Sequence, residues 1–138
     1  MDEAKCDLVR AWLIKARHDL DTAHQISGLP QGHLDVAIYH CQQAAEKAIK
    51  GYLAFQDHPP ERIHDLKRLV GLAAGYDSAF ADLLNAAVIL NPYATAFRYP
   101  NEAPLLEPTR IEFTEALEAA TRLVQFVLSR LPSAVQPV

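Results

Sequence analysis

One stretch of the sequence concentrates side chains that bind ions: residues 42–50 include Gln42, Gln43, Glu46, Lys47 and Lys50. Glu46 and Lys50 are four residues apart, as are Gln43 and Lys47, so in a helix each pair would lie on one face. Such pairs on an exposed face contribute only about 0.3–0.5 kcal/mol each. The spacing alone therefore favours a solvated helix face.

Asp19 falls within the apolar face of the helix that is predicted around it. At 100° per residue, Asp19 lies about 20° from both Leu8 and Ile26 on the helical wheel. Burying an unpaired carboxylate costs several kcal/mol, so Asp19 requires either donors from across the bundle or partial exposure at a groove. A plain position at the edge of the core is an equal alternative.

The loop sequence FRYP at residues 97–100 places an arginine between aromatic side chains and before a proline. The planar guanidinium of Arg98 is suited to bind a phosphate or to pair with a carboxylate such as Asp19 or Glu46. The sequence leaves both uses open. We expect Arg98 to lie at a groove beside the first two helices, where acidic, ammonium and guanidinium groups would form one anion-binding cluster.

The histidines and cysteines do not match a known metal or nucleophile pattern. His33 and His40 are seven residues apart and would supply two ligands on one face, which is too few for zinc. His64, in the sequence HDL, suggests a capping or loop role. Cys6 and Cys41 form no CxxC pair and predict reduced thiols. No glycine-rich phosphate loop or GxSxG turn occurs. The sequence therefore predicts no metal and no cofactor.

Apolar residues recur every three to four positions through most of the chain, which predicts helices. Thr109 and Glu112 fit a capping box. No segment alternates like a strand. We therefore predict an all-α fold, an up-and-down antiparallel helical bundle of four long helices plus one short helix. The long helices are expected at about 4–26 and 33–56, from an N-cap at Ser78 to Pro92, and from Thr109 to about 131, and the short helix at about 63–73.

Composition and length predict one domain. Half of the 138 residues are apolar, which is enough for one core, so residues 1–138 are expected to form a single domain with its core at about 4–131 and a frayed tail at 132–138. The net charge of -4 means that contact with a polyanion must be local. No apolar run approaches the roughly 18 residues of a membrane span, and the N-terminus is acidic. We expect a cytoplasmic protein without membrane contact.

These features together resemble the HEPN domain family (higher eukaryotes and prokaryotes nucleotide-binding domain). The resemblance covers about residues 4–131, and its specific part is the QQAAEKAIK block with a downstream RYP. It is carried by Ala16 and Asp19 to Ala23 in the first helix, YHCQQAAEKAIK at 39–50, HDL at 64–66 with Leu69, and FRYP at 97–100.

The resemblance implies a five-helix domain that is usually a homodimer and is often encoded beside a minimal nucleotidyltransferase, with which it acts as a toxin-antitoxin or related two-component system. It also implies a polar groove that binds a nucleotide or nucleic-acid phosphate. Carried over by position, the residues lining this groove would be Asp19, Glu46, Lys47, Lys50, Arg98 and Tyr99.

Many HEPN proteins are metal-independent ribonucleases with an arginine, four to six further residues and then a histidine. After Arg98 the corresponding positions are Ala103, Pro104 and Leu105, and no histidine follows. Without an imidazole, general acid-base cleavage loses its usual agent. Tyr99 is a poor substitute because a phenol with a pKa near 10 is protonated at pH 7. We therefore expect no catalytic residue, with Arg98 the one weak candidate.

Three interpretations stay open from the sequence. The chain is a phosphate-binding companion of a nucleotidyltransferase, or an endoribonuclease toxin in which the loop arginine works with His40 or His64, or a dimeric scaffold whose polar block is an interior network. For the homodimer, Leu13, Val36 and Phe126 lie beside the main apolar stripes and are expected to cover a partner surface.

Overall fold

The computed structural model describes residues 2–100 and 106–138, and within them it contains helices and no strand. The all-α prediction is confirmed. Ala103, Pro104 and Leu105 lie outside the described residues. No helix of the described residues is long and apolar enough to cross a bilayer.

The α-helices are α1 (Glu3–Ser27), α2 (Leu34–Phe55), α3 (Leu66–Ala74), α4 (Leu84–Leu90) and α5 (Arg110–Ser129), and the 3₁₀ helices are η1 (Ser78–Leu83), η2 (Asn91–Ala94) and η3 (Ser133–Val135).

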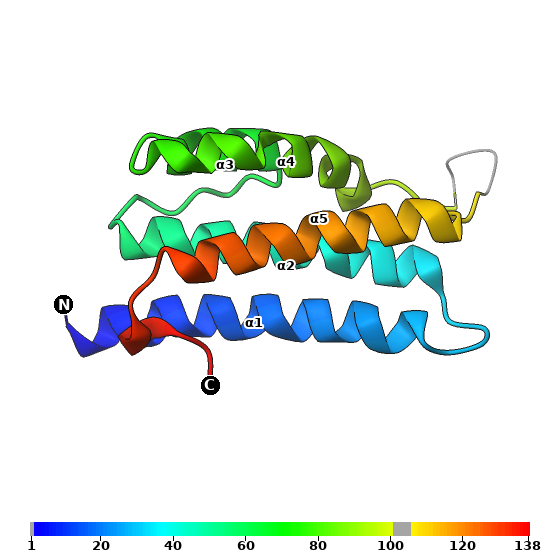
Figure 1. Ribbon diagram of the computed structural model, residues 1–138, viewed down its shortest axis with the longest axis horizontal. Coiled ribbons are helices and arrows are strands. Elements are labelled where there is room, and N and C mark those ends of the chain that lie inside the picture. Colours follow the sequence, from blue (N-terminus) through cyan, green and yellow to red (C-terminus); the bar gives the residue numbers. More distant parts are fainter. Residues whose placement is uncertain (1, 101–105) are drawn as a thin grey trace.

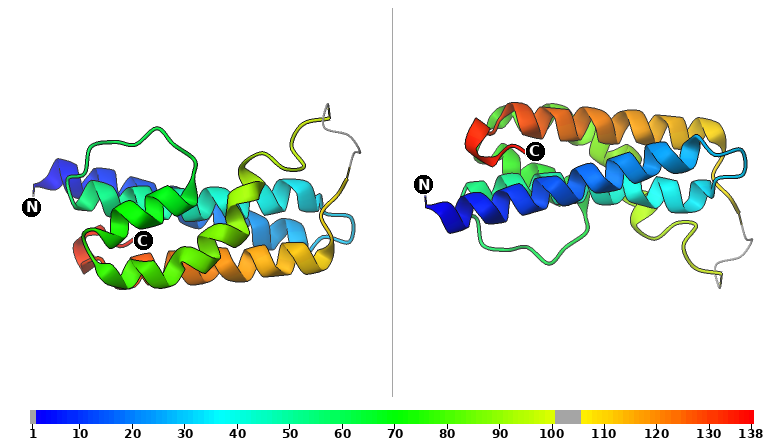
Figure 2. Two further views of the ribbon diagram at one scale, coloured as in Figure 1. Left: turned by 90° about the horizontal axis from the view of Figure 1, so that it is seen from above. Right: turned by 90° about the horizontal axis from the view of Figure 1, so that it is seen from below.

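The long helices alternate in direction, as predicted for an up-and-down bundle. Figure 1 shows α1, α2, the segment containing α4, and α5 running back and forth along one axis, with the short α3 beside α4 in the layer that covers α2 and α5. Figure 2 shows the same arrangement from above and below. Helix α2 contacts α1, α5 and α3, so it is the central helix of the fold.

The central position of α2 follows from its composition. Its core residues include many alanines, such as Ala37, Ala44, Ala45 and Ala48, which are fully buried. Small side chains let neighbouring helix axes approach closely. A Cβ atom added at Gly51 would lie only 3.1 Å from Cβ of Trp12 on α1. Because α2 has neighbours on three sides, polar residues on several of its faces are enclosed by protein.

The fourth helix is shorter than predicted. Its N-cap is Asp77 rather than Ser78, since the Asp77 side chain accepts a hydrogen bond from the backbone of Ala79. The buried residues Phe80 and Leu83 are three apart, the repeat of a 3₁₀ helix, and this segment winds as η1 before α4 begins. Helix α4 ends at Leu90 and a 3₁₀ turn containing Pro92 follows.

The last helix begins as predicted. The hydroxyl of Thr109 accepts the backbone N–H of Glu112 at 3.0 Å, and the Glu112 carboxylate accepts the backbone N–H of Thr109 at 2.9 Å. This reciprocal pair satisfies two donors at the helix start that would otherwise lack partners. The capping box is confirmed.

The C-terminal tail differs from the frayed segment that the sequence predicts. Val135 is fully buried, and Arg10 on α1 donates to the backbone carbonyl of Ala134. Arg17, about two turns further along α1, donates to the carbonyl of Pro137 at 3.2 Å. These contacts join residues more than a hundred positions apart, so no local pattern in the tail indicates them.

The prediction that Leu13 covers a partner surface is wrong, because Leu13 is 1% exposed and belongs to the core. Phe126 is partly buried and packs edge-to-face on Phe80, with ring centroids 5.0 Å apart. Val36 is exposed, as predicted. Homodimerisation therefore stays a prediction. Of the three side chains expected at the partner surface, only Val36 is exposed.

Candidate functional site

Asp19 lies between α1 and α2 and has a donor at each carboxylate oxygen. Its Oδ1 is 2.7 Å from Nδ1 of His40, and its Oδ2 accepts from Nζ of Lys47 at 2.7 Å. Asp19 is 7% exposed, so the two contacts offset the cost of removing a carboxylate from water. Of the two options that the sequence allowed, the structure shows the donors across the helix interface.

Glu46 is the centre of a second polar group on α2. Its carboxylate accepts from Nε2 of Gln42 at 3.1 Å and from Nζ of Lys50 at 3.0 Å, and Nδ1 of His64 lies 3.0 Å from Oε1. Burial raises the pKa of Glu46, and the hydrogen bonds from Gln42, His64 and Lys50 outweigh it, so the pKa lies below its ordinary value. The carboxylate is therefore ionised at neutral pH.

The interpretation of residues 42–50 as a solvated face is wrong. Gln42 is fully buried and Glu46 is 4% exposed, while Lys47 and Lys50 are partly exposed. The reason is that α3 and the segment ahead of it cover this side of α2, which a two-faced helical wheel does not represent. Glu46 and Lys50 pair as their spacing predicts, whereas Gln43 donates to Oε1 of Gln42 at 2.7 Å instead of pairing with Lys47.

From the sequence, His64 suggested a capping or loop role, or a base that works with Arg98, and its position beside Glu46 was not predicted. It precedes α3, whose N-cap is Asp65 rather than His64. Since a carboxylate accepts hydrogen bonds, Nδ1 of His64 is the donor in this contact, and Nε2 is an acceptor whenever the ring is neutral. The His64 side chain is 70% exposed. Eighteen residues separate His64 from Glu46, so only the tertiary fold reveals the pair.

The side chain of Arg98 packs against Tyr39 of α2 and does not contact the carboxylate of Asp19 or of Glu46. Its guanidinium carbon is 4.0 Å from the ring centroid of Tyr39 and 5.2 Å from that of Tyr99, and Nη1 donates to the carbonyl of Ala94 at 2.9 Å. Among the described residues Arg98 has no acidic partner. Pairing with Asp19 or Glu46, one of the two uses predicted for Arg98, is therefore not what the structure shows.

The backbone of the FRYP loop helps to aim Arg98. Phe97 has a φ of 67°, in the left-handed region that costs energy for a residue with a side chain. Its ring stacks on Tyr93 with centroids 6.1 Å apart, which holds this conformation in place. Burial raises the pKa of Tyr93.

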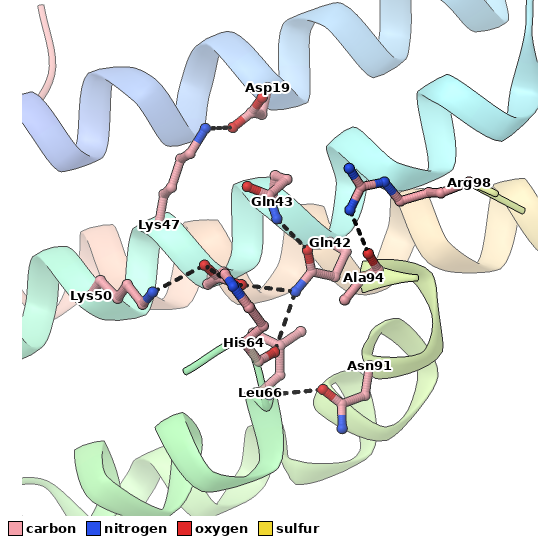
Figure 3. Close-up of polar contacts among 11 residues, drawn as sticks. Asp19, Gln42, Gln43, Lys47, Lys50, His64, Leu66, Asn91, Ala94 and Arg98 are labelled. Carbon is pink, nitrogen blue, oxygen red and sulfur yellow. Dashed lines mark hydrogen bonds and ion pairs between the residues drawn. The ribbon is translucent and has the colours of Figure 1, made fainter. Parts of the chain in front are cut away.

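The polar side chains follow one face of α2, as Figure 3 shows. Tyr39, Gln43, Glu46 and Lys50 share this face because they are spaced by three or four residues. We call this set of side chains the polar row. Its members are Arg98 with Tyr39, then Gln42 and Gln43, then Glu46 with His64, and finally Lys50. Tyr39 and Glu46 are seven residues apart, about 10 Å along a helix axis, so Arg98 and the Glu46 group lie about two turns from each other.

The predicted single cluster is thus three groups along α2. Asp19 with His40 and Lys47 lies beside the row at the α1–α2 interface, Glu46 with Lys50 lies within it, and Arg98 with Tyr99 lies at its end. With neutral histidines, the three cations and two carboxylates leave a formal net charge of about +1. This local positive charge is found on a chain whose overall charge is -4.

Neither a metal-binding cluster nor a reactive thiol at Cys41 is indicated in the part of the chain that the structure describes. No group of three His, Cys, Asp or Glu side chains there is placed to hold a metal ion. Cys41 is buried, and burial raises the pKa of its thiol to about 12, so the reactive thiolate does not form at neutral pH.

Comparison with known proteins agrees with this architecture. A family model for the HEPN domain matches residues 9–131. The crystal structure of TT1696 from Thermus thermophilus superposes with a TM-score of 0.80 at 33% identity, covering 89% of this chain and 98% of that one. The crystal structure of ST0689, an archaeal HEPN homologue, gives a TM-score of 0.70 at 31% identity, covering 88% and 96%. No curated protein matches significantly. Because the family model and both similar structures span most of the chain, from α1 through α5, the chain belongs to the HEPN domain family.

Proposed function

We propose that this chain binds the phosphate of a nucleotide or nucleic acid at the polar row and is the helical companion of a minimal nucleotidyltransferase in a toxin-antitoxin-like system, without catalysing a reaction itself. The observation that carries the proposal is the state of Arg98. A guanidinium has five N–H donors, and the contacts in the described residues use one of them, to Ala94. The aromatic ring of Tyr39 holds the cation without neutralising it.

The lysines support the same function. Lys47 and Lys50 each contact one carboxylate, and an ammonium group has three N–H donors, so both retain capacity for a phosphate oxygen. Asp19 and Glu46 position these lysines and limit the net charge. A site of this kind favours an anion at short range while the acidic molecule as a whole repels polyanions.

The direct test is a thermal-shift titration with ADP and with inorganic phosphate. We expect ADP to raise the melting temperature of the wild-type protein, and Arg98→Ala and Lys50→Gln each to reduce the rise. Arg122→Ala is the matched control, because Arg122 is an exposed arginine on α5 away from the row. The absence of any shift at millimolar ADP and phosphate would refute phosphate binding.

The proposed partners are a second copy of the chain and the nucleotidyltransferase. Sedimentation at micromolar concentration is expected to give about twice the monomer mass of 15.3 kDa, and a mass near 15.3 kDa would reject the dimer. Identifying the neighbouring reading frame is the quickest check on the second partner. A short nucleotidyltransferase that co-purifies with this chain is the expected result, and an unrelated neighbour would contradict it.

The His64–Glu46 pair favours a second candidate function, a metal-independent endoribonuclease. In that reaction Nε2 of His64 would take the proton of a 2′-hydroxyl and the 2′-oxygen would bond to phosphorus. The bond from phosphorus to the 5′-oxygen would break as that oxygen takes a proton from the His64 imidazolium or from water, giving a 2′,3′-cyclic phosphate and a 5′-hydroxyl. The separation of about two helical turns between the Glu46 group and Arg98 makes this the weaker candidate, because both must reach one phosphodiester.

Cleavage of labelled RNA in EDTA tests this candidate. Activity in the wild type that is lost in both His64→Ala and Arg98→Ala would support it. His40→Ala is the comparison variant, because His40 is the other candidate base in the sequence and its Nδ1 forms a hydrogen bond with Asp19. If the wild-type protein leaves RNA intact, the endoribonuclease candidate is removed.

A further inference from the structure

A cavity of about 460 Å³ lies where the start of α1 meets the end of α2 and the segment that follows α2. This volume is in the range of small-molecule sites, which are usually apolar with a few polar groups at the edge. The cavity fits that description. Its lining includes Leu8, Trp12, Leu53, Pro59, Pro60 and Lys50.

Lys50 connects this cavity to the polar row. The lysine lines the cavity, and its Nζ is 3.0 Å from Oε2 of Glu46. Figure 3 shows Lys50 at one end of the polar row. A ligand in the cavity would therefore lie next to the ammonium group of Lys50. The cavity and the row are adjacent parts of one surface.

The lining also offers hydrogen-bond acceptors. Asp57 and Glu61 both line the cavity, where Lys5 contacts Asp57 at 2.9 Å and His58 contacts Glu61 at 3.2 Å. Apolar walls that include an indole ring suit stacking of an aromatic ring, which is favourable for every nucleobase. The carboxylates suit the amino and N–H groups of such a base, and they disfavour an acidic head group at that edge.

We propose that this cavity holds the base of the nucleotide whose phosphate binds at Lys50 and along the polar row. The inference rests on the proposed phosphate-binding function and adds the second half of the ligand. The base stacks beside Trp12 between Leu8 and the proline pair, while the first phosphate contacts Lys50. The ligand class is a nucleoside phosphate, free or at the end of a nucleic acid, rather than inorganic phosphate alone.

Trp12 makes the test direct, because it is the only tryptophan of the chain. Its emission is excited at the red edge of indole absorption, where nucleotides absorb little, and is followed during titration with ADP, adenosine and pyrophosphate. We expect ADP to change the emission with saturation, and adenosine to do so at higher concentration. Pyrophosphate is expected to raise the melting temperature with little effect on the emission.

Two exposed leucines provide a matched pair of variants. Leu8 is 55% exposed and lines the cavity, and Leu29 is 57% exposed and lies beyond the other end of α1. Leu8→Gln is expected to raise the dissociation constant of ADP about fivefold, the effect of losing roughly 1 kcal/mol of apolar contact, and to leave pyrophosphate binding unchanged. Leu29→Gln is expected to match the wild type with both ligands.

The outcomes separate this inference from the proposed function. If ADP and pyrophosphate raise the melting temperature equally and Trp12 emission stays constant, phosphate binding stands and the base pocket is refuted. If no phosphate compound binds but adenosine changes the emission, the proposed function fails and the pocket holds a nucleoside without the row. Equal ADP affinity in Leu8→Gln and the wild type would also overturn the placement of the base.

Discussion

Nδ1 of His64 lies 3.0 Å from Oε1 of Glu46, and this contact joins the segment ahead of α3 to the middle of α2. Glu46 accepts from Gln42 and Lys50 as well, so three donors surround one buried carboxylate. A buried charge is tolerated when its partners are complete and becomes costly when one is removed. The stability of the fold and the position of Lys50 therefore depend on the same carboxylate.

Glu46→Gln is expected to lower the free energy of unfolding by about 2–3 kcal/mol, because the neutral amide loses the charge-assisted bonds and leaves Lys50 with an unpaired ammonium group. Urea unfolding at pH 7 measures the change. Glu118→Gln is the control, since Glu118 is exposed on α5. A loss for Glu46→Gln no larger than that of the control would show that the buried group does not hold α2 and α3 together.

The same carboxylate predicts a pH dependence. The pKa of Glu46 lies below its ordinary value of 4.5, because its hydrogen bonds outweigh the effect of burial. Its ionised form therefore stabilises the fold above about pH 4.5, and this contribution is lost as the pH falls through the lower folded pKa.

Urea unfolding of the wild type between about pH 5 and pH 3 should show a decrease that is smaller in Glu46→Gln. Asp65 contributes in the same direction in both proteins, because the hydrogen bond from Asn91 chiefly lowers its pKa. Parallel pH curves for the two proteins would contradict the assignment to Glu46.

Two glycines predict opposite effects of the same substitution. A Cβ atom on Gly32 would lie 2.0 Å from the carbonyl oxygen of Ile26, so the turn between α1 and α2 must shift to accept it. A Cβ atom on Gly71, inside α3, meets nothing within 4 Å. Gly32→Ala should lower the free energy of unfolding by about 1–3 kcal/mol, and Gly71→Ala should raise it by about 0.5–1 kcal/mol. Thermal unfolding of the two variants checks both signs, and a stabilised Gly32→Ala would mean that the turn differs from the one described.

The helices could be predicted from the sequence because their determinants are local. Apolar residues repeat with the helical period in α1, α2 and α5, and the Thr109 capping box marks the start of α5. The fourth helix was less predictable, since the three-residue spacing of Phe80 and Leu83 is compatible with both an α-helix and a 3₁₀ helix until packing selects one.

The candidate site was only partly predictable, for a physical reason. Asp19 was identified because a carboxylate on an apolar face must be paired. The burial of Gln42 and Glu46 was missed because a helical wheel describes one buried face, whereas α2 is enclosed by three neighbours. Alanines on several faces of α2 were the available signal. The contact of Arg98 with Tyr39 joins a loop to a distant helix, and no local pattern indicates it.

Asp19 and Lys47 allow the interior-network interpretation to be separated from the binding one. Asp19→Asn should lower the free energy of unfolding by about 2–3 kcal/mol, because Lys47 and His40 lose a charged acceptor at a buried position. Lys47→Met leaves the carboxylate with His40 alone. If the two side chains stabilise each other directly, the double variant should lose at least about 0.5 kcal/mol less than the sum of the single losses, as measured by urea unfolding.

Thermal shifts with ADP on the same three variants show whether Lys47 also contacts phosphate. A network that only supports the α1–α2 interface would lower the melting temperature without changing the ADP-induced rise, whereas a lysine that also contacts phosphate would reduce that rise in Lys47→Met even where the protein is folded. Additive losses in the double variant would show that Asp19 and Lys47 act independently, and the pairing at 2.7 Å would then carry no coupling energy.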